Sequence, residues 1–112
     1  GDGVLVAEGA PDAVITFTGT TQTAGWWHGL AFTSPGDNRV ANAEVSYGGS
    51  DFWDPCCPQD SGEASVNVFD GGRLTLTDST VFGGEAFAVF VHPGSTLSAS
   101  GNDYRGEPTS IP

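Results

Sequence analysis

The residues with the most obvious chemical potential lie in one short stretch, residues 50–62. It contains two adjacent cysteines, Cys56 and Cys57, with a proline on either side. Because the chain has only two cysteines, a disulfide would be either a strained bond between these neighbours or a bond between two chains. Free thiols are the alternative, and an oxidising compartment favours the disulfide.

The same stretch carries three carboxylates that could hold a cation, Asp51, Asp54 and Asp60. Carboxylate oxygens suit calcium, but the spacing of these three residues matches no known calcium-binding loop. Calcium is therefore only a weak candidate, and we otherwise predict no cofactor.

Five aromatic residues within and before this stretch could form one exposed binding surface. Sugars stack on such rings, and partner proteins bury them. Alternatively, one or two of the rings cover the fold as ordinary core. The five residues are Trp26, Trp27, Tyr47, Phe52 and Trp53.

No residues have the spacing of a catalytic or zinc site. Lysine is absent, and no two carboxylates fall at equivalent positions of adjacent repeats, as acid–base catalysis by a stacked pair would require. His28 and His92 do not combine with the adjacent cysteines in a zinc-binding pattern. We therefore predict no catalytic residues and no enzymatic activity.

Composition indicates one all-β domain spanning residues 1–112. The chain has 17 glycines and 7 prolines, and Val, Thr, Phe and Ser dominate its regular stretches. No window shows the apolar spacing of an amphipathic helix.

The net charge of −11 argues against nucleic acid and anionic membranes as partners. No apolar run reaches the roughly 18 residues of a membrane span. The chain begins at Gly1 and shows no signal peptide, which we interpret as a processed mature chain or an excised piece of a longer one. We predict a secreted or cell-surface location.

Apolar residues repeat every 23 positions in the second half of the chain. Val66 matches Val89, and Leu74 matches Leu97. One unit earlier the step is 36 residues, from Leu30 to Val66. The excess of 13 residues is assigned to an insertion at 50–62, which has turn formers and no alternation.

The first unit is predicted at residues 4–20. A step of 23 from the second unit places Phe17 beside Val40 and Ile15 beside Asn38, so residues 13–18 would form its second strand. Asn38 then falls in an apolar column. A buried Asn needs partners, so we expect it at a bend or bonded to the backbone of a neighbouring unit.

Four such units would stack as coils of a β-solenoid, with like residues about 4.8 Å apart in neighbouring coils. A compact antiparallel sandwich of short strands is the alternative.

Two runs of sequence, WHGLAF at 27–32 and NRVANAEVSYGG at 38–49, resemble coils of the right-handed parallel β-helix repeat family, the pectin-lyase-like fold. This resemblance implies a right-handed parallel β-helix of about four coils with one inserted loop. Coils of this kind serve lyases, hydrolases, adhesins and structural modules, so they indicate fold better than function.

A parallel solenoid exposes unpaired backbone groups at both ends, and the sequence shows no amphipathic cap for either end. This predicts that the chain meets copies of itself end to end, or further β-helix coils. We therefore predict a non-enzymatic extracellular structural module of a fibre, appendage or surface layer. The alternatives are a carbohydrate-binding or adhesive module that uses the aromatic insertion, and a fragment of a polysaccharide lyase or hydrolase.

Overall fold

The structure, a computed structural model, describes residues 4–23, 26–27, 29–49, 64–69 and 71–111. These residues form eleven strands and no helix, so none of them lies in a helix that could cross a membrane. The strands are β1 (Val6–Glu8), β2 (Ile15–Phe17), β3 (Leu30–Phe32), β4 (Asn38–Ala41), β5 (Ala43–Ser46), β6 (Ala64–Val68), β7 (Arg73–Thr77), β8 (Thr80–Phe82), β9 (Phe87–Val91), β10 (Thr96–Ser100) and β11 (Thr109–Ser110).

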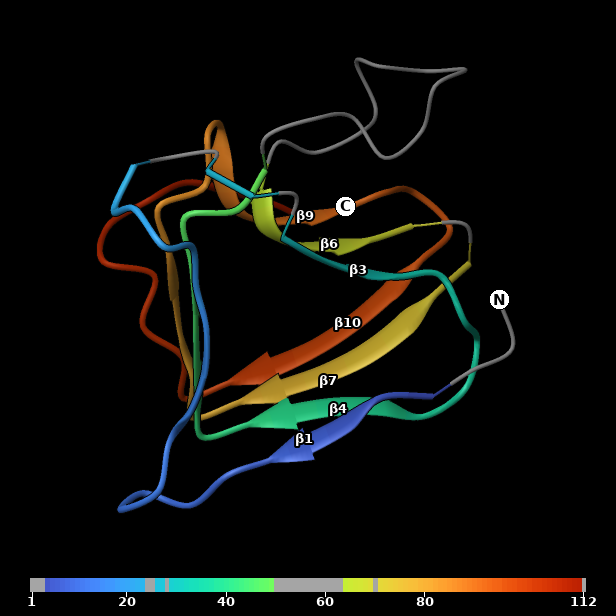
Figure 1. Ribbon diagram of the computed structural model, residues 1–112. Helices are drawn as coiled ribbons and strands as arrows, with labels where there is room; N and C mark the ends of the chain where they lie inside the picture. The colour runs from blue at the N-terminus through green and yellow to red at the C-terminus, as the bar shows by residue number, and fades with distance from the viewer. Residues whose placement is uncertain (1–3, 24–25, 28, 50–63, 70, 112) are drawn as a thin grey trace.

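The strands form three parallel sheets, ordered β1-β4-β7-β10, β2-β5-β8 and β3-β6-β9-β11. Every pairing between named strands is parallel, so the antiparallel sandwich is wrong and the expected all-β parallel class is confirmed. From β1 to β9 the chain visits the three sheets in fixed rotation, and between β10 and β11 only an isolated parallel bridge from Asp103 to Thr80 stands in place of a strand beside β8. Figure 1 shows β1, β4, β7 and β10 on one side of the molecule and β3, β6 and β9 on another.

The strand register matches the predicted columns from the second unit onwards. Val40 lies opposite Leu76 and Leu76 opposite Ala99. Leu30, Val66 and Val89 form a second column, and Val45 and Val81 belong to a third. The 23-residue step is therefore a real structural period in this part of the chain.

The register predicted for the first unit is wrong. Ile15 lies opposite Ala43 and Phe17 opposite Val45, so β2 pairs with β5 and not with β4. The partner of β4 is β1, with Ala7 opposite Val40. The first unit is longer than 23 residues, and alternation with a period of two fits either sheet equally well.

The extra residues of the second unit lie where the sequence places them. Residues 47–63 separate β5 from β6, whereas only residues 83–86 separate β8 from β9. The difference of 13 positions equals the predicted insertion. The inserted residues 50–62 themselves lie outside the described residues.

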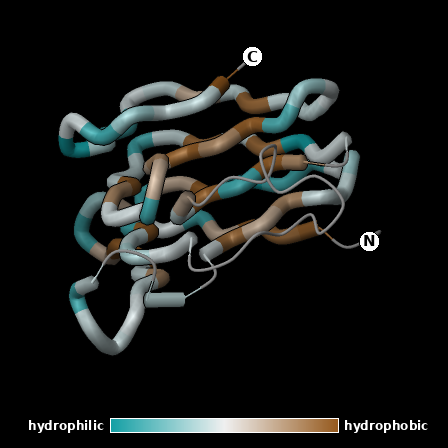
Figure 2. Tube along the Cα trace, turned by 90° about the horizontal axis from the view of Figure 1, so that it is seen from above, coloured by the Kyte–Doolittle hydropathy of each residue, from teal (hydrophilic) through white to brown (hydrophobic). Residues whose placement is uncertain are grey.

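The core lies between the three sheets and is built from short branched side chains. Seven of them are at most 1% exposed and come from all three sheets, and burying each contributes about 1.5–3 kcal/mol. They are Val40, Val45, Val66, Val68, Leu76, Val81 and Val89. Figure 2 shows the layers of chain stacked on one another.

One corner of the stack turns within a single residue. Asn42, Asp78 and Gly101 follow β4, β7 and β10, and all have positive φ angles of 49°, 50° and 69°. Asn, Asp and Gly are the residues that enter this left-handed region most readily. The Asn42 N–H donates to the Thr77 carbonyl, so the backbone ladder continues through the corner.

Asn38 meets the expectation for a buried polar residue. Its Oδ1 accepts from the Leu5 N–H at 2.9 Å, and its Nδ2 donates to the carbonyls of Ser34 at 3.1 Å and Arg73 at 2.9 Å. It therefore lies at a bend and also bonds the residue before β1 and the first residue of β7, the two strands that flank β4 in its sheet.

Candidate functional site

Most of the predicted site residues belong to the inserted stretch and lie outside the described residues. This holds for Phe52 and Trp53, for Cys56 and Cys57, and for the three acids Asp51, Asp54 and Asp60. Their binding, disulfide and calcium assignments remain predictions. Within the described part of the chain, no group of three His, Cys, Asp or Glu residues could hold a metal ion.

Trp27 covers the core of the fold. Its ring is half-buried against the apolar cluster, and its Nε1 donates to the Ser46 carbonyl at 2.6 Å. Its backbone N–H donates to the Tyr47 carbonyl at 3.2 Å. These contacts fix Trp27 to the end of β5, and the polar atom of its side chain, Nε1, already has a hydrogen-bond partner.

Tyr47 is also held by neighbours. It has a positive φ of 63° at the end of β5, and its ring meets the Phe82 ring edge-on at a centroid distance of 5.2 Å. The Arg105 guanidinium lies 3.9 Å from the centre of the Phe82 ring. Tyr47 thus belongs to a lateral stack of side chains that joins the end of β5, the end of β8 and the turn that holds Arg105.

Trp26 remains accessible among the three described aromatic candidates. Its side chain is 51% exposed, and its Nε1 donates to Thr20 Oγ1 at 2.9 Å. A Cβ on Gly19 would lie 2.5 Å from the Trp26 ring, so the ring rests directly on that glycine. This arrangement holds the ring in one place while leaving much of it open to a ligand.

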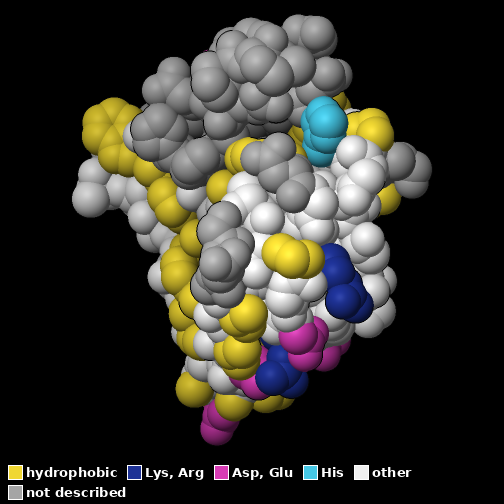
Figure 3. All heavy atoms as spheres, turned by 90° about the vertical axis from the view of Figure 1, so that its right-hand side faces the viewer, with side chains coloured by type: hydrophobic (Ala, Val, Ile, Leu, Met, Phe, Trp, Pro, Cys, Tyr) yellow, Lys and Arg dark blue, Asp and Glu magenta, His cyan; other side chains and the backbone are white. Residues whose placement is uncertain are grey.

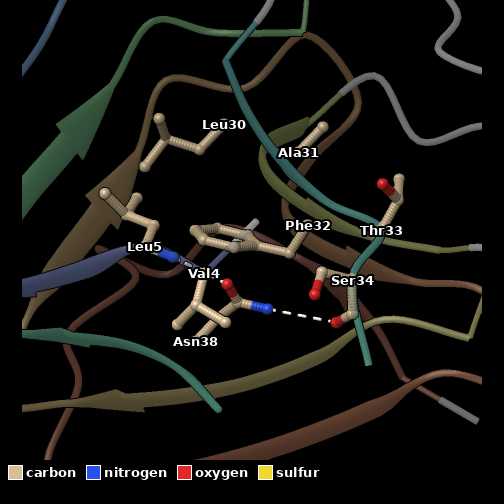
Figure 4. Close-up of a pocket in the computed structure, with 8 residues that line it drawn as sticks. All are labelled: Val4, Leu5, Leu30, Ala31, Phe32, Thr33, Ser34 and Asn38. Atoms are coloured by element: carbon tan, nitrogen blue, oxygen red, sulfur yellow. Dashed lines mark hydrogen bonds between the residues drawn. The ribbon is translucent and has the colours of Figure 1, made fainter. Parts of the chain in front are cut away.

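A pocket of about 280 Å³ opens beside β3, an edge strand of its sheet. Eight residues from the chain before β1, from β3 and from the turn into β4 line it (Figure 4), namely Val4, Leu5, Leu30, Ala31, Phe32, Thr33, Ser34 and Asn38. The hydrogen bond from Leu5 N–H to Asn38 Oδ1 fixes one wall, and the Asn38 bond to Ser34 fixes another. Leu30 and Phe32 make its floor apolar.

Apolar side chains are exposed around this end. Val4 is 53% exposed, Leu5 38% and Val14 53%, and all three lie directly before the first two strands, β1 and β2. Figure 3 shows a band of hydrophobic side chains along its left margin. Ile111, 49% exposed, follows β11 directly. Large apolar residues thus remain uncovered beside both the first strands and the last strand of the described chain.

Sequence reasoning missed the pocket because it looked for unusual residues in the inserted stretch. The available signal was the run Val4-Leu5-Val6 in the first unit, three apolar residues where one face of a strand would need only alternate ones.

Comparisons of the chain with protein-family models, with curated proteins and with solved structures found no match. The functional reasoning therefore rests on the geometry of this chain, and its resemblance to the β-helix repeat family remains a prediction.

Proposed function

We propose that the three sheets are the faces of a right-handed parallel β-solenoid. The rotation of the chain through the same three sheets supports this, because each complete round is then one coil. Columns such as Leu30, Val66 and Val89 supply the stacked interior that a solenoid needs. The right hand follows from the strong preference of parallel crossover connections.

We propose further that the chain is a non-enzymatic structural module that assembles by stacking coils of one copy on coils of the next. The observation that carries this function is the exposure of apolar side chains in both the first and the last coil, by Val4, Leu5 and Ile111. The backbone at each outer strand of a parallel sheet also lacks a partner on one side and templates further pairing. A secreted or surface location fits the acidic composition and a disulfide at Cys56 or Cys57.

Sedimentation velocity of the purified chain tests this function. We expect species heavier than the 11.5 kDa monomer, increasing with protein concentration. Because each copy carries a charge of −11, copies repel one another, and salt screens that repulsion over about 10 Å at 0.1 M and about 3 Å at 1 M. Assembly should therefore increase with salt. A monomer at every concentration and salt level would refute the proposal.

A second candidate function is carbohydrate binding, favoured by the exposed and anchored ring of Trp26. A sugar ring that stacks on an aromatic face gains affinity from the contact area and from the uneven charge distribution of the aromatic ring. Phe52 and Trp53, which lie outside the described residues, would extend this surface.

A glycan array probed with the native chain and with Trp26→Ala tests the second candidate. We expect at least a tenfold loss of binding for Trp26→Ala and a smaller loss for Trp26→Phe, which keeps an aromatic face. Thr16→Ala, at an exposed position on β2, is the matched control and should bind as the native chain does. Absence of glycan binding by the native chain would remove this candidate.

A further inference from the structure

One sheet connects the pocket to the exposed Ile111. In the sheet β3-β6-β9-β11, Phe32 lies opposite Val68, and Val68 opposite Val91. Ser110 lies opposite Phe90, so the next residue, Ile111, continues the same column beside Val91. The column thus runs from Phe32 in the first complete coil to Ile111 in the last.

One end of this column borders a pocket, and the other end presents an exposed apolar side chain. Phe32 is 4% exposed and borders the 280 Å³ pocket, whereas Ile111 is 49% exposed at the opposite edge of the sheet. The pocket is smaller than the roughly 300–1,000 Å³ of small-molecule sites. Its size and its apolar lining of Val4, Leu5 and Leu30 suit a protein side chain better than a drug-sized ligand.

The backbone at the pocket also points outward. β3 is an edge strand, and the Phe32 carbonyl accepts from the Phe69 N–H on the side of β6. Because successive residues of a strand direct their backbone groups to opposite neighbours, Ala31 directs its N–H and C=O away from β6. An added strand can therefore pair there while its alternate side chains enter the pocket.

We infer that the pocket receives Ile111 of a second copy, whose β11 extends the sheet as a parallel strand beside β3. Ile111 of one copy then lies beneath Phe32 of the next, and Thr109 lies beneath Leu30. The side-chain columns of one copy therefore continue into the next copy. The contact is head to tail and leaves a free pocket and a free Ile111 on every dimer, so it propagates as a filament. This inference rests on the proposed function and names its contact.

Cysteine cross-linking between two populations of chains tests the contact. Both populations carry Cys56→Ser and Cys57→Ser, and one adds Leu5→Cys while the other adds Ile111→Cys. Both positions are exposed, so the substitutions should leave the fold intact, which circular dichroism checks. Mixing and mild oxidation should give a disulfide-linked heterodimer joining residues 5 and 111. The control is Val14→Cys. Val14 is exposed, at 53% against 38% for Leu5, but lies outside the pocket, so this variant should give at least fivefold less heterodimer with Ile111→Cys.

A second pair of variants, in the chain that keeps Cys56 and Cys57, tests the same contact. Ile111→Asp should abolish the heavier species in sedimentation velocity, whereas Ile111→Val should keep them, because aspartate cannot enter an apolar pocket without losing its hydration. If the native chain assembles but the 5–111 link is no more frequent than the control, or Ile111→Asp still assembles, the inferred contact is wrong and the proposed function stands. A strictly monomeric native chain overturns both.

Discussion

Asn38 connects three coils through a single amide. At 3% exposure it bonds Leu5 in the coil before, Ser34 in its own turn and Arg73 in the coil after. Each of these backbone groups would otherwise need water at a place where apolar residues pack. The amide also fixes Leu5, so it holds one wall of the pocket in position.

Asn38→Ala should lower the free energy of unfolding by about 2–4 kcal/mol, because it leaves several poorly solvated backbone groups unpaired. Urea unfolding at one fixed protein concentration measures this loss. Asp37→Ala is the neighbouring control. Its carboxylate is exposed and meets Arg39 at 3.6 Å, and such surface ion pairs contribute at most about 1 kcal/mol. Equal midpoints for Asn38→Ala and the native chain would contradict the role given to this amide.

The residues of the candidate site were only partly predictable from sequence. Residue type predicts either that Trp26, Trp27 and Tyr47 share one exposed surface or that one or two of them cover the core, and it does not decide between these. In the structure Trp27 packs against the core and Tyr47 packs against Phe82. What decides exposure is the position of each ring relative to strands in other coils, and a linear pattern does not contain that information. The need of Asn38 for backbone partners was predictable, because burial of an amide has only a few solutions.

Strand by strand, the later units follow from the sequence and the first does not. Columns such as Val66–Val89 were recognisable because β-branched and Leu residues recur at a constant step. In the first unit, Glu8 and Ile15 are seven positions apart where their partners Ala41 and Ala43 are two apart. Five extra residues there shift the register out of the 23-residue period.

A second displacement follows between the first unit and the second. Phe17 and Leu30 are 13 positions apart, whereas the matching residues Val81 and Val89 are eight apart. Because alternation repeats every two residues, the sequence pattern of β2 fits the sheet of β4 as well as that of β5. Only the corner after β4, where Asn42 turns the chain within one residue, reveals that a third sheet intervenes.

At the scale of the whole molecule, the proposed end-to-end assembly and the net charge of the chain oppose each other. Parallel sheets leave an edge strand on each side, here β1, β2 and β3 towards the first coil and β10 and β11 towards the last. Apolar columns and open backbone favour stacking there, and the charge of −11 limits it by repulsion between copies. We therefore expect the proposed assembly to depend on salt.

Fibre diffraction from aligned assemblies formed at high salt tests the central claim most directly. Strands perpendicular to the stacking axis predict a meridional reflection near 4.8 Å. Because the two larger sheets hold four strands each, every copy should also add a repeat of about 19 Å, four strand spacings of about 4.8 Å, along the same axis. A meridional 4.8 Å reflection together with the 19 Å repeat is the result predicted for solenoids stacked end to end. A 4.8 Å reflection on the equator, or on the meridian without the longer repeat, would contradict it.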